Sequence, residues 1–198
     1  KVGKSEVRRF VGEFWTSGQR QASSLHEVSY RACFKPQLPH YFIKRFTKEG
    51  DTVYDPFGGR GTTAVEAALM GRRVISNDAN PLSRLLLSPR LCPPSLMEVE
   101  KRLEAIKYRK GLKADIDLTM FYDSETESEI VSLKCYLQDK SESGQEDIVD
   151  AWIRMVATNR LTGHSPGFFS VYTFPPNQAV SPESQKKINE KRKQKPEY

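Results

Sequence analysis

The chain has 198 residues, of which 37% are hydrophobic and 28% charged, so it can bury one domain core with at most an appended subregion. Its formal charge of +6 and its pI of about 9.2 fit a polyanionic partner, although a modest basic excess also occurs in proteins that never bind nucleic acid. Three cysteines without a Cys-x-x-Cys pair, and apolar runs well short of the roughly 18 residues of a membrane helix, argue against a disulfide framework, a metal site and a membrane span. We therefore expect a cytoplasmic protein, and because the chain begins at Lys1 we expect a processed or partial sequence.

The first predicted elements are a helix, a strand and a second helix. Residues 39–46 have apolar side chains at positions 42, 43 and 46, which is helical spacing. A β-prone run at residues 52–54 enters a glycine-rich turn, and the helix formers of residues 64–70 follow it. Strand, tight loop and helix in this order are typical of a nucleotide-type cofactor site, because glycines let the backbone approach a ligand and the helix N-terminus presents free N–H groups.

Two cofactor classes fit this loop by its glycine spacing. Gly59 and Gly61 suit a dinucleotide-binding loop, and Asp78 lies 17 positions after Gly61 (78 less 61), close to the roughly 20 expected of a ribose-binding acid. Asp55 at the end of the strand favours S-adenosylmethionine, because its carboxylate would repel a pyrophosphate and attract an ammonium or a sulfonium. Arg60 offsets part of that repulsion, so NAD stays open. A Walker phosphate loop is excluded because no Gly-Lys-Ser or Gly-Lys-Thr follows the glycines.

A second strand and helix follow directly. Residues 73–77 are predicted as a strand, and Asn80 caps a helix that begins at Pro81 and continues to Ser88. We expect the prolines at positions 89, 93 and 94 to end it. Two strands, each followed by a helix at short spacing, imply a parallel sheet with right-handed crossovers. Ligands in such sheets bind outside the carboxyl ends of the strands, where both acids lie.

The chain becomes mainly helical from Ser95 onward. Helical spacing predicts three helices, over residues 95–108, 124–137 and 146–160. Their apolar stripes are predicted to pack in the core. The second helix would begin with a capping box at residues 124–127, and residues 140–145 would form a mobile loop after it. Residues 168–174 are aromatic and β-prone, and Ser181 would start a final helix.

That final helix carries the densest positive run in the chain. Its candidate DNA-binding residues are Lys186, Lys187, Lys191, Arg192 and Lys193. Such a run is either a solvated helix face or a contact surface for DNA phosphates, and the sequence leaves both interpretations open.

The sequence Asp-Pro-Phe-Gly-Gly-Arg-Gly-Thr-Thr at residues 55–63 resembles the Asp-Pro-Phe-x-Gly-x-Gly-Thr-Thr cofactor motif of the DNA amino-methyltransferases. That family methylates N6 of adenine or N4 of cytosine with S-adenosylmethionine. Residues 34–51 resemble the segment that precedes this loop and closes over the methionine end of the cofactor. Residues 73–82 are similar to the second strand, whose terminal acid binds the ribose hydroxyls. The resemblance covers residues 33–88.

The resemblance implies a fold, a cofactor and a set of site residues. The fold is α/β, a Rossmann-like class I methyltransferase with a parallel sheet, here partial, together with a mainly helical insertion or recognition region. The cofactor is S-adenosyl-L-methionine, with Asp55 near its amino group and Asp78 on its ribose. The cofactor-binding residues are Phe34, Lys35, Pro36, Asp55, Pro56, Phe57, Gly59, Gly61, Thr62, Thr63 and Asp78.

The second motif of the family does not appear. In it Asp, Asn or Ser precedes Pro-Pro and an aromatic residue, and these groups hold the exocyclic amine and stack on the flipped base. The two Pro-Pro pairs here, at residues 92–95 and 174–177, have neither the polar residue first nor the aromatic residue last. The catalytic residues are therefore unassigned, with Asn177 the first to mutate. We expect them on a missing C-terminal part or on a partner chain.

Three functions remain open at this point. The chain is the cofactor-binding and partly target-recognising portion of a site-specific DNA methyltransferase of a restriction-modification system, inactive by itself. Alternatively it is a non-catalytic subunit that binds S-adenosylmethionine and DNA. An NAD-dependent oxidoreductase ranks last. The predicted division is a cofactor region at 1–92, a helical insertion that could read the target at 93–178, and a basic C-terminal helix or tail at 179–198.

Overall fold

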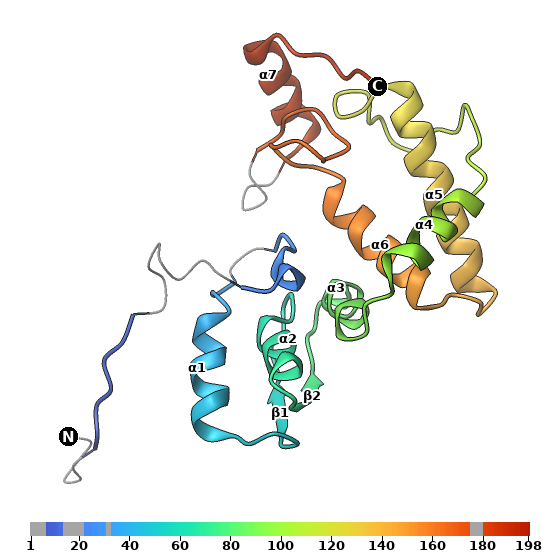
Figure 1. Ribbon diagram of the computed structural model, residues 1–198. Helices are drawn as coiled ribbons and strands as arrows, with labels where there is room; N and C mark the ends of the chain where they lie inside the picture. The colour runs from blue at the N-terminus through green and yellow to red at the C-terminus, as the bar shows by residue number, and fades with distance from the viewer. Residues whose placement is uncertain (1–6, 14–21, 31–32, 175–179) are drawn as a thin grey trace.

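The computed structural model describes residues 7–13, 22–30, 33–174 and 180–198 (Figure 1). The elements of the first half are η2 (Ser24–His26), α1 (Gln37–Phe46), β1 (Thr52–Asp55), α2 (Thr62–Leu69), β2 (Arg73–Ser76) and α3 (Pro81–Leu91). Those of the second half are α4 (Leu96–Ala105), α5 (Ser124–Glu142), α6 (Ile148–Arg160) and α7 (Pro182–Arg192). Within the described ranges, every helix is too short or too polar to cross a membrane.

The strands β1 and β2 pair in parallel, as the sequence predicts. Thr52 lies opposite Arg73 and Asp55 opposite Ser76, so both strands end at the same edge. Helix α2 covers one face of this pair, where Ala64, Val65 and Leu87 form a buried cluster that Val74 packs against. The other face is open, since Tyr54 is 60% exposed and Ile75 is 55% exposed. The α/β prediction is confirmed as one β-α-β unit of a partial Rossmann-like fold.

Helix α3 begins as predicted but ends later. Asn80 caps it by accepting the Leu82 N–H, whereas Pro89 lies inside the helix, which continues to Leu91. Proline normally breaks a helix because it lacks an N–H and its ring crowds the preceding turn. Here the buried Arg90 holds the last turn in place: its guanidinium donates to the Leu86 carbonyl at 2.7 Å and to the Leu25 carbonyl at 2.8 Å.

The helical half differs from the sequence prediction at three places. Helix α4 ends at Ala105 instead of residue 108, and none of its residues is buried, so its apolar stripe does not form core. Helix α5 is capped by Asp123 instead of Ser124, because the Asp123 carboxylate accepts two backbone N–H groups of the first turn. It also runs on to Glu142, into the predicted loop.

Helix α6 joins the two halves of the molecule. It packs along α3, and Met155 forms a buried cluster with Val28 and Leu86. The Asn159 side chain accepts a hydrogen bond from the Ser29 N–H at 2.8 Å, so the end of α6 is attached to the segment before α1.

The β-prone run after α6 forms no strand among the described residues. It contains only a single bridge, between Gly163 and Tyr172. A third buried cluster, Met120 to Tyr122, contacts this run, since the Val171 N–H donates to the Phe121 carbonyl at 3.1 Å. The predicted final helix is confirmed as α7, with Ser181 as its cap. The domain boundaries at 92 and 178 stay a prediction.

Candidate cofactor-binding site

The glycine loop lies directly over the carboxyl ends of the two strands. Gly58 donates its N–H to the Asn77 carbonyl at 2.9 Å, and Asn77 donates to the Asp55 carbonyl at 2.9 Å. The loop then turns through Gly59 and Gly61, whose φ angles of 53° and 84° are left-handed and favour glycine. Its backbone is therefore held at the position where ligands bind in parallel sheets.

Asp78 fastens this loop to the end of β2. Its Oδ2 accepts the Gly59 N–H at 2.7 Å and its Oδ1 accepts the Asn80 N–H at 2.8 Å. These two backbone hydrogen bonds lower the pKa of Asp78, so the carboxylate is ionised at neutral pH. Each oxygen keeps a further lone pair that can accept a hydroxyl, as a ribose diol requires.

Asp55 ends the neighbouring strand, so the structure brings the two predicted acids to one edge of the sheet. The Asp55 Oδ1 accepts the Phe57 N–H at 3.1 Å, and the side chain is half-buried. Among the described residues, Asp55 has no ion pair with a basic side chain. Its carboxylate is therefore available to a cationic ligand group.

An apolar cavity of about 390 Å³ lies between α1 and β1. Phe34 and Thr63, two predicted cofactor residues from separate segments, both line it, together with Phe42, Phe46 and Val53. The structure thus brings the segment before α1 and the first turn of α2 to one cavity. Such a cavity offers apolar burial to the uncharged part of a ligand.

The other predicted cofactor residues occupy varied positions. Lys35 is exposed and Pro36 is buried at the start of α1. Pro56 is exposed, and Phe57 projects into solvent with 87% of its surface exposed. Thr62 is buried, and its hydroxyl accepts the Arg60 Nε–H at 3.0 Å.

Arg60 has a structural contact that the sequence does not reveal. Its Nη1 donates to the Val28 carbonyl at 2.9 Å, while its Nε is bonded to Thr62. The guanidinium is thereby held between the loop and the segment before α1. Because it is engaged there, it gives little support to a pyrophosphate next to Asp55.

Sequence reasoning missed a buried carboxylate beneath the loop. Glu66 on α2 bonds His26 at 2.7 Å through one oxygen and His40 at 3.0 Å through the other. His40 is exposed at the first turn of α1, and its ring also holds Glu66. Burial alone would raise the pKa of Glu66, but the hydrogen bonds from the two histidines outweigh it and lower the pKa. These residues are far apart in sequence, and no local pattern connects them.

The candidate catalytic and DNA-binding residues are only partly visible. Asn177 lies outside the described residues. The other proline pair, Pro93 and Pro94, links α3 to α4. Lysines 186, 187 and 191 on α7 and Lys193 at its C-cap are exposed. Arg192 is exposed too, and its guanidinium lies over the Tyr172 ring, 3.7 Å from the centroid. Within the described ranges, no group of three or more His, Cys, Asp or Glu side chains is placed to hold a metal ion.

Residues 3–83 match the protein family described as DNA methylase. The chain is 38% identical to the type II methyltransferase M.MjaII of Methanocaldococcus jannaschii over 44% of this chain and 17% of that protein. It is 34% identical to the orphan methyltransferase M.BamHII of Bacillus amyloliquefaciens over 45% of this chain and 34% of that protein. It is 51% identical to the type II methyltransferase M2.DpnII of Streptococcus pneumoniae over 22% of this chain and 18% of that protein.

A solved protein of Thermus thermophilus, assigned as a DNA modification methylase, is 33% identical over 33% of this chain and 28% of that chain, with a TM-score of 0.29. The chain spans between about a sixth and a third of the length of the curated relatives named above. The matched part includes the glycine loop and Asp78. The similarity to DNA methylases thus covers residues 3–83, which is under half of the 198-residue chain.

Proposed function

We propose that this chain binds S-adenosylmethionine as the cofactor-binding part of a site-specific DNA methyltransferase that methylates an exocyclic amine, N6 of adenine or N4 of cytosine. The observation that carries the proposal is the pair of carboxylates at the ends of β1 and β2, with the glycine loop closed onto Asp78. The match of residues 3–83 to the DNA methylase family, and relatives named type II methyltransferases, support the substrate.

Each acid has a distinct role in this proposal. Asp55, half-buried and without a basic partner in the described structure, attracts the amino group of the methionine part. Asp78, fixed by two backbone N–H groups, accepts the ribose hydroxyls. Phe34 and Thr63 border the apolar cavity beside β1, on the side of the methionine part. S-adenosylmethionine supplies the methyl group, and the protein residues position it.

Calorimetry with S-adenosylmethionine and with NAD tests the cofactor. We expect binding of S-adenosylmethionine only, weakened about tenfold or more by Asp55→Ala and by Asp78→Ala, because each removes a charge-assisted interaction. Asp139→Ala, which removes an exposed carboxylate on α5, is the matched control and should bind like the wild type. Unchanged affinity in both folded site variants would contradict the assignment.

A methyl-transfer assay tests what this chain does alone. We expect the 198-residue chain to bind cofactor and yet to transfer no radiolabelled methyl group to mixed-sequence DNA. The reason is that the motif that would orient the amine and stack on the base does not occur in the sequence, and positioning supplies most of the rate in such transfers. Robust transfer would show that a different group performs this role, and Asn177→Ala would then be the first variant to make.

One further experiment distinguishes a methyltransferase from a non-catalytic subunit: the methyl-transfer assay is repeated with added protein. If the same assay becomes active when a longer product of the gene, or a partner chain, is added, the methyltransferase proposal stands. Cofactor and DNA binding without transfer under every such combination would favour the subunit.

A further inference from the structure

A second cavity, of about 560 Å³, lies beside the glycine loop and outside the cofactor site described above. One wall is the segment before α1, with His26 and Tyr30, together with Arg60 of the loop. The opposite wall is the end of α6 and the turn after it, with Arg160 and His164. The cavity therefore lies between the cofactor-binding half and the helical half of the chain.

Hydrogen bonds within the protein hold both walls of this cavity in place without a ligand. Asn159 accepts the Ser29 N–H at 2.8 Å, and Arg60 donates to the Val28 carbonyl at 2.9 Å. The turn after α6 is closed by the Phe169 N–H, which donates to the Arg160 carbonyl at 2.9 Å. A ligand binds such a preformed cavity at low entropic cost, because few side chains have to be ordered.

The charges that line this cavity are not neutralised by the protein. Among the residues that the structure describes, neither Arg60 nor Arg160 forms an ion pair with an acid. The Arg160 guanidinium lies over the Phe168 ring, 5.2 Å from its centroid, which orients it without removing its charge. Glu27 is the one acid in the lining, and it is exposed. An anionic group is therefore favoured here.

Aromatic and polar groups complete the lining. Tyr30, Phe168 and His164 are rings that can stack on a base. His26 also lines the cavity, is 6% exposed, and has a buried Nδ1 without a hydrogen-bond partner among the described residues. Guanidinium groups together with stacking rings are the chemistry that holds single nucleotides of DNA.

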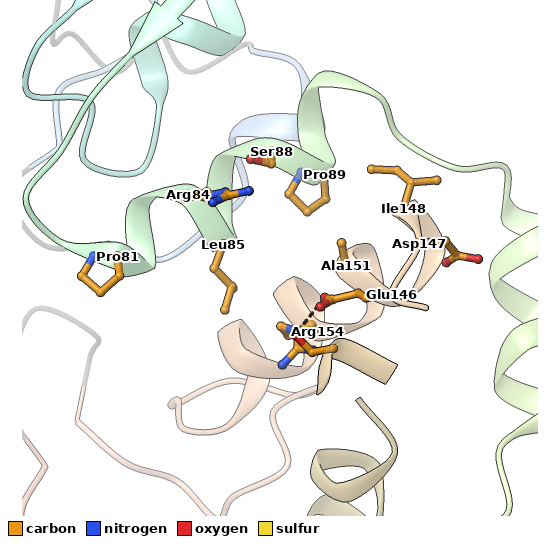
Figure 2. Close-up of a pocket in the computed structure, with 11 residues that line it drawn as sticks. Pro81, Arg84, Leu85, Ser88, Pro89, Glu146, Asp147, Ile148, Ala151 and Arg154 are labelled. Carbon is orange, nitrogen blue, oxygen red and sulfur yellow. Dashed lines mark hydrogen bonds and ion pairs between the residues drawn. The ribbon is translucent and has the colours of Figure 1, made fainter. Parts of the chain in front are cut away.

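A larger cavity, of about 630 Å³, lies between α3 and α6, and several of its charged side chains are paired within the protein (Figure 2). Its Arg154 is paired with Glu146 at 3.0 Å and also donates to the Leu137 carbonyl at 2.7 Å. Its Asp147 is paired with Arg102 at 2.6 Å. The remaining cation of the lining, Arg84, is exposed and forms no ion pair among the described residues. The two acids Glu146 and Asp147 balance the two arginines Arg84 and Arg154, so this lining has no net positive charge and favours an anion less.

We propose that the cavity of His26, Tyr30, Arg60, Arg160, His164 and Phe168 binds a nucleotide of the DNA substrate by its phosphodiester group, with Arg160 as the main phosphate ligand. Tyr30 links this cavity to the cofactor site, since its ring approaches Gly59 and its hydroxyl accepts the Asn80 Nδ2–H at 3.3 Å. A nucleotide held here lies next to the glycine loop. The proposal rests on the proposed function, because it takes DNA as the substrate.

The test is a titration of a short mixed-sequence DNA duplex, and of one of its single strands, at several salt concentrations. We expect Arg160→Gln to weaken binding about tenfold and to reduce the slope of log affinity against log salt by about one, the loss of one phosphate contact. Arg73→Gln, which removes the same charge from the exposed opposite end of β2, is the control and should change neither quantity.

A second pair of variants avoids any effect on folding. Ser165→Glu places a negative charge on an exposed lining residue and should weaken DNA binding to a similar extent. Ser88→Glu adds the same charge to the exposed lining of the larger cavity and should not. Wild-type affinity in both Arg160→Gln and Ser165→Glu, or no DNA binding by the wild type, overturns the proposal. Calorimetry with S-adenosylmethionine on the same proteins separates the phosphate site from the proposed function. If Arg160→Gln binds both the cofactor and DNA like the wild type, only the phosphate site is refuted. If the wild type does not bind the cofactor, the proposed function is refuted.

Discussion

Gly61 holds the glycine loop against the core through its backbone angle and its lack of a side chain. A Cβ added there would lie 2.5 Å from Leu87 Cδ1, and the φ angle of 84° is unfavourable for other residues. We expect Gly61→Ala to lower the free energy of unfolding by about 2–4 kcal/mol, the sum of backbone strain and overpacking. Urea denaturation measures the loss.

Gly50 provides the control for that prediction. Its φ angle of 85° is nearly the same, but a Cβ there would meet nothing within 4 Å. Gly50→Ala should therefore show the backbone term alone, about 1 kcal/mol. Equal losses in the two variants would mean that Leu87 moves aside and that packing does not fix the loop.

Glu66 makes the stability of the cofactor half depend on acid pH. Its pKa is lowered from the ordinary value of 4.5, because the hydrogen bonds from His26 and His40 outweigh burial. A lowered carboxyl pKa contributes stability that is present above the unfolded value and is lost as pH falls below it. We expect the wild type to lose more free energy of unfolding than Glu66→Gln between about pH 6 and about pH 3.

Urea denaturation at several pH values in that interval measures this difference. Glu100→Gln, at an exposed position of α4, is the control and should follow the wild type. Parallel curves for the wild type and Glu66→Gln would show that the histidine contacts do not favour the ionised carboxylate.

Helix α5 shows how one residue decides where an element begins. The sequence Ser-Glu-Thr-Glu at 124–127 predicts a capping box, but the preceding Asp123 accepts the N–H groups of Glu125 and Thr126 at 2.8 and 3.2 Å. We expect Asp123→Ala to cost about 1 kcal/mol of unfolding free energy and Ser124→Ala much less. Thermal unfolding of both variants measures which substitution costs more stability. A larger loss in Ser124→Ala than in Asp123→Ala would support the capping box that the sequence predicts.

Helix α4 has the right periodicity for burial but no partner. Its stripe was predicted to be core, yet Leu96 is 73% exposed and the adjacent Met97 is 74% exposed. Hydrophobic periodicity predicts that a face is apolar, and a partner surface has to bury it. In the described structure no partner surface covers most of α4. Ile106, the first residue after the helix, is buried.

The whole molecule combines a basic net charge with an exposed lysine segment, so we expect weak, salt-dependent binding to duplex DNA. Replacing the exposed lysines 186, 187, 191 and 193 by glutamine should reduce the slope of log affinity against log salt by at least about one. Arg192 is left in place because it packs on Tyr172. The control replaces four exposed lysines elsewhere, at 101, 107, 113 and 134, and an equal change there would show that α7 is only a solvated face.

The sequence by itself determined the cofactor-binding unit of this protein. The order of β1, α2, β2 and α3, the glycine loop and Asp78 follow from short-range signals: β-prone runs, glycines, helix formers and the Asn80 cap. These features are local, so neighbouring residues suffice to predict them. The residues around the loop carry the family resemblance for the same reason.

Only the tertiary structure decided what surrounds that unit. Arg90 continues α3 past Pro89 because its guanidinium reaches Leu25, 65 positions away. Glu66 reaches His26 across 40 positions, and Asn159 reaches Ser29 across 130, which creates one wall of the second cavity. Such contacts depend on how whole elements pack, and the period of a helix or strand does not encode its partner. Local chemistry therefore specified the loop, and packing specified which charges on either side of it are matched and which are left for a ligand.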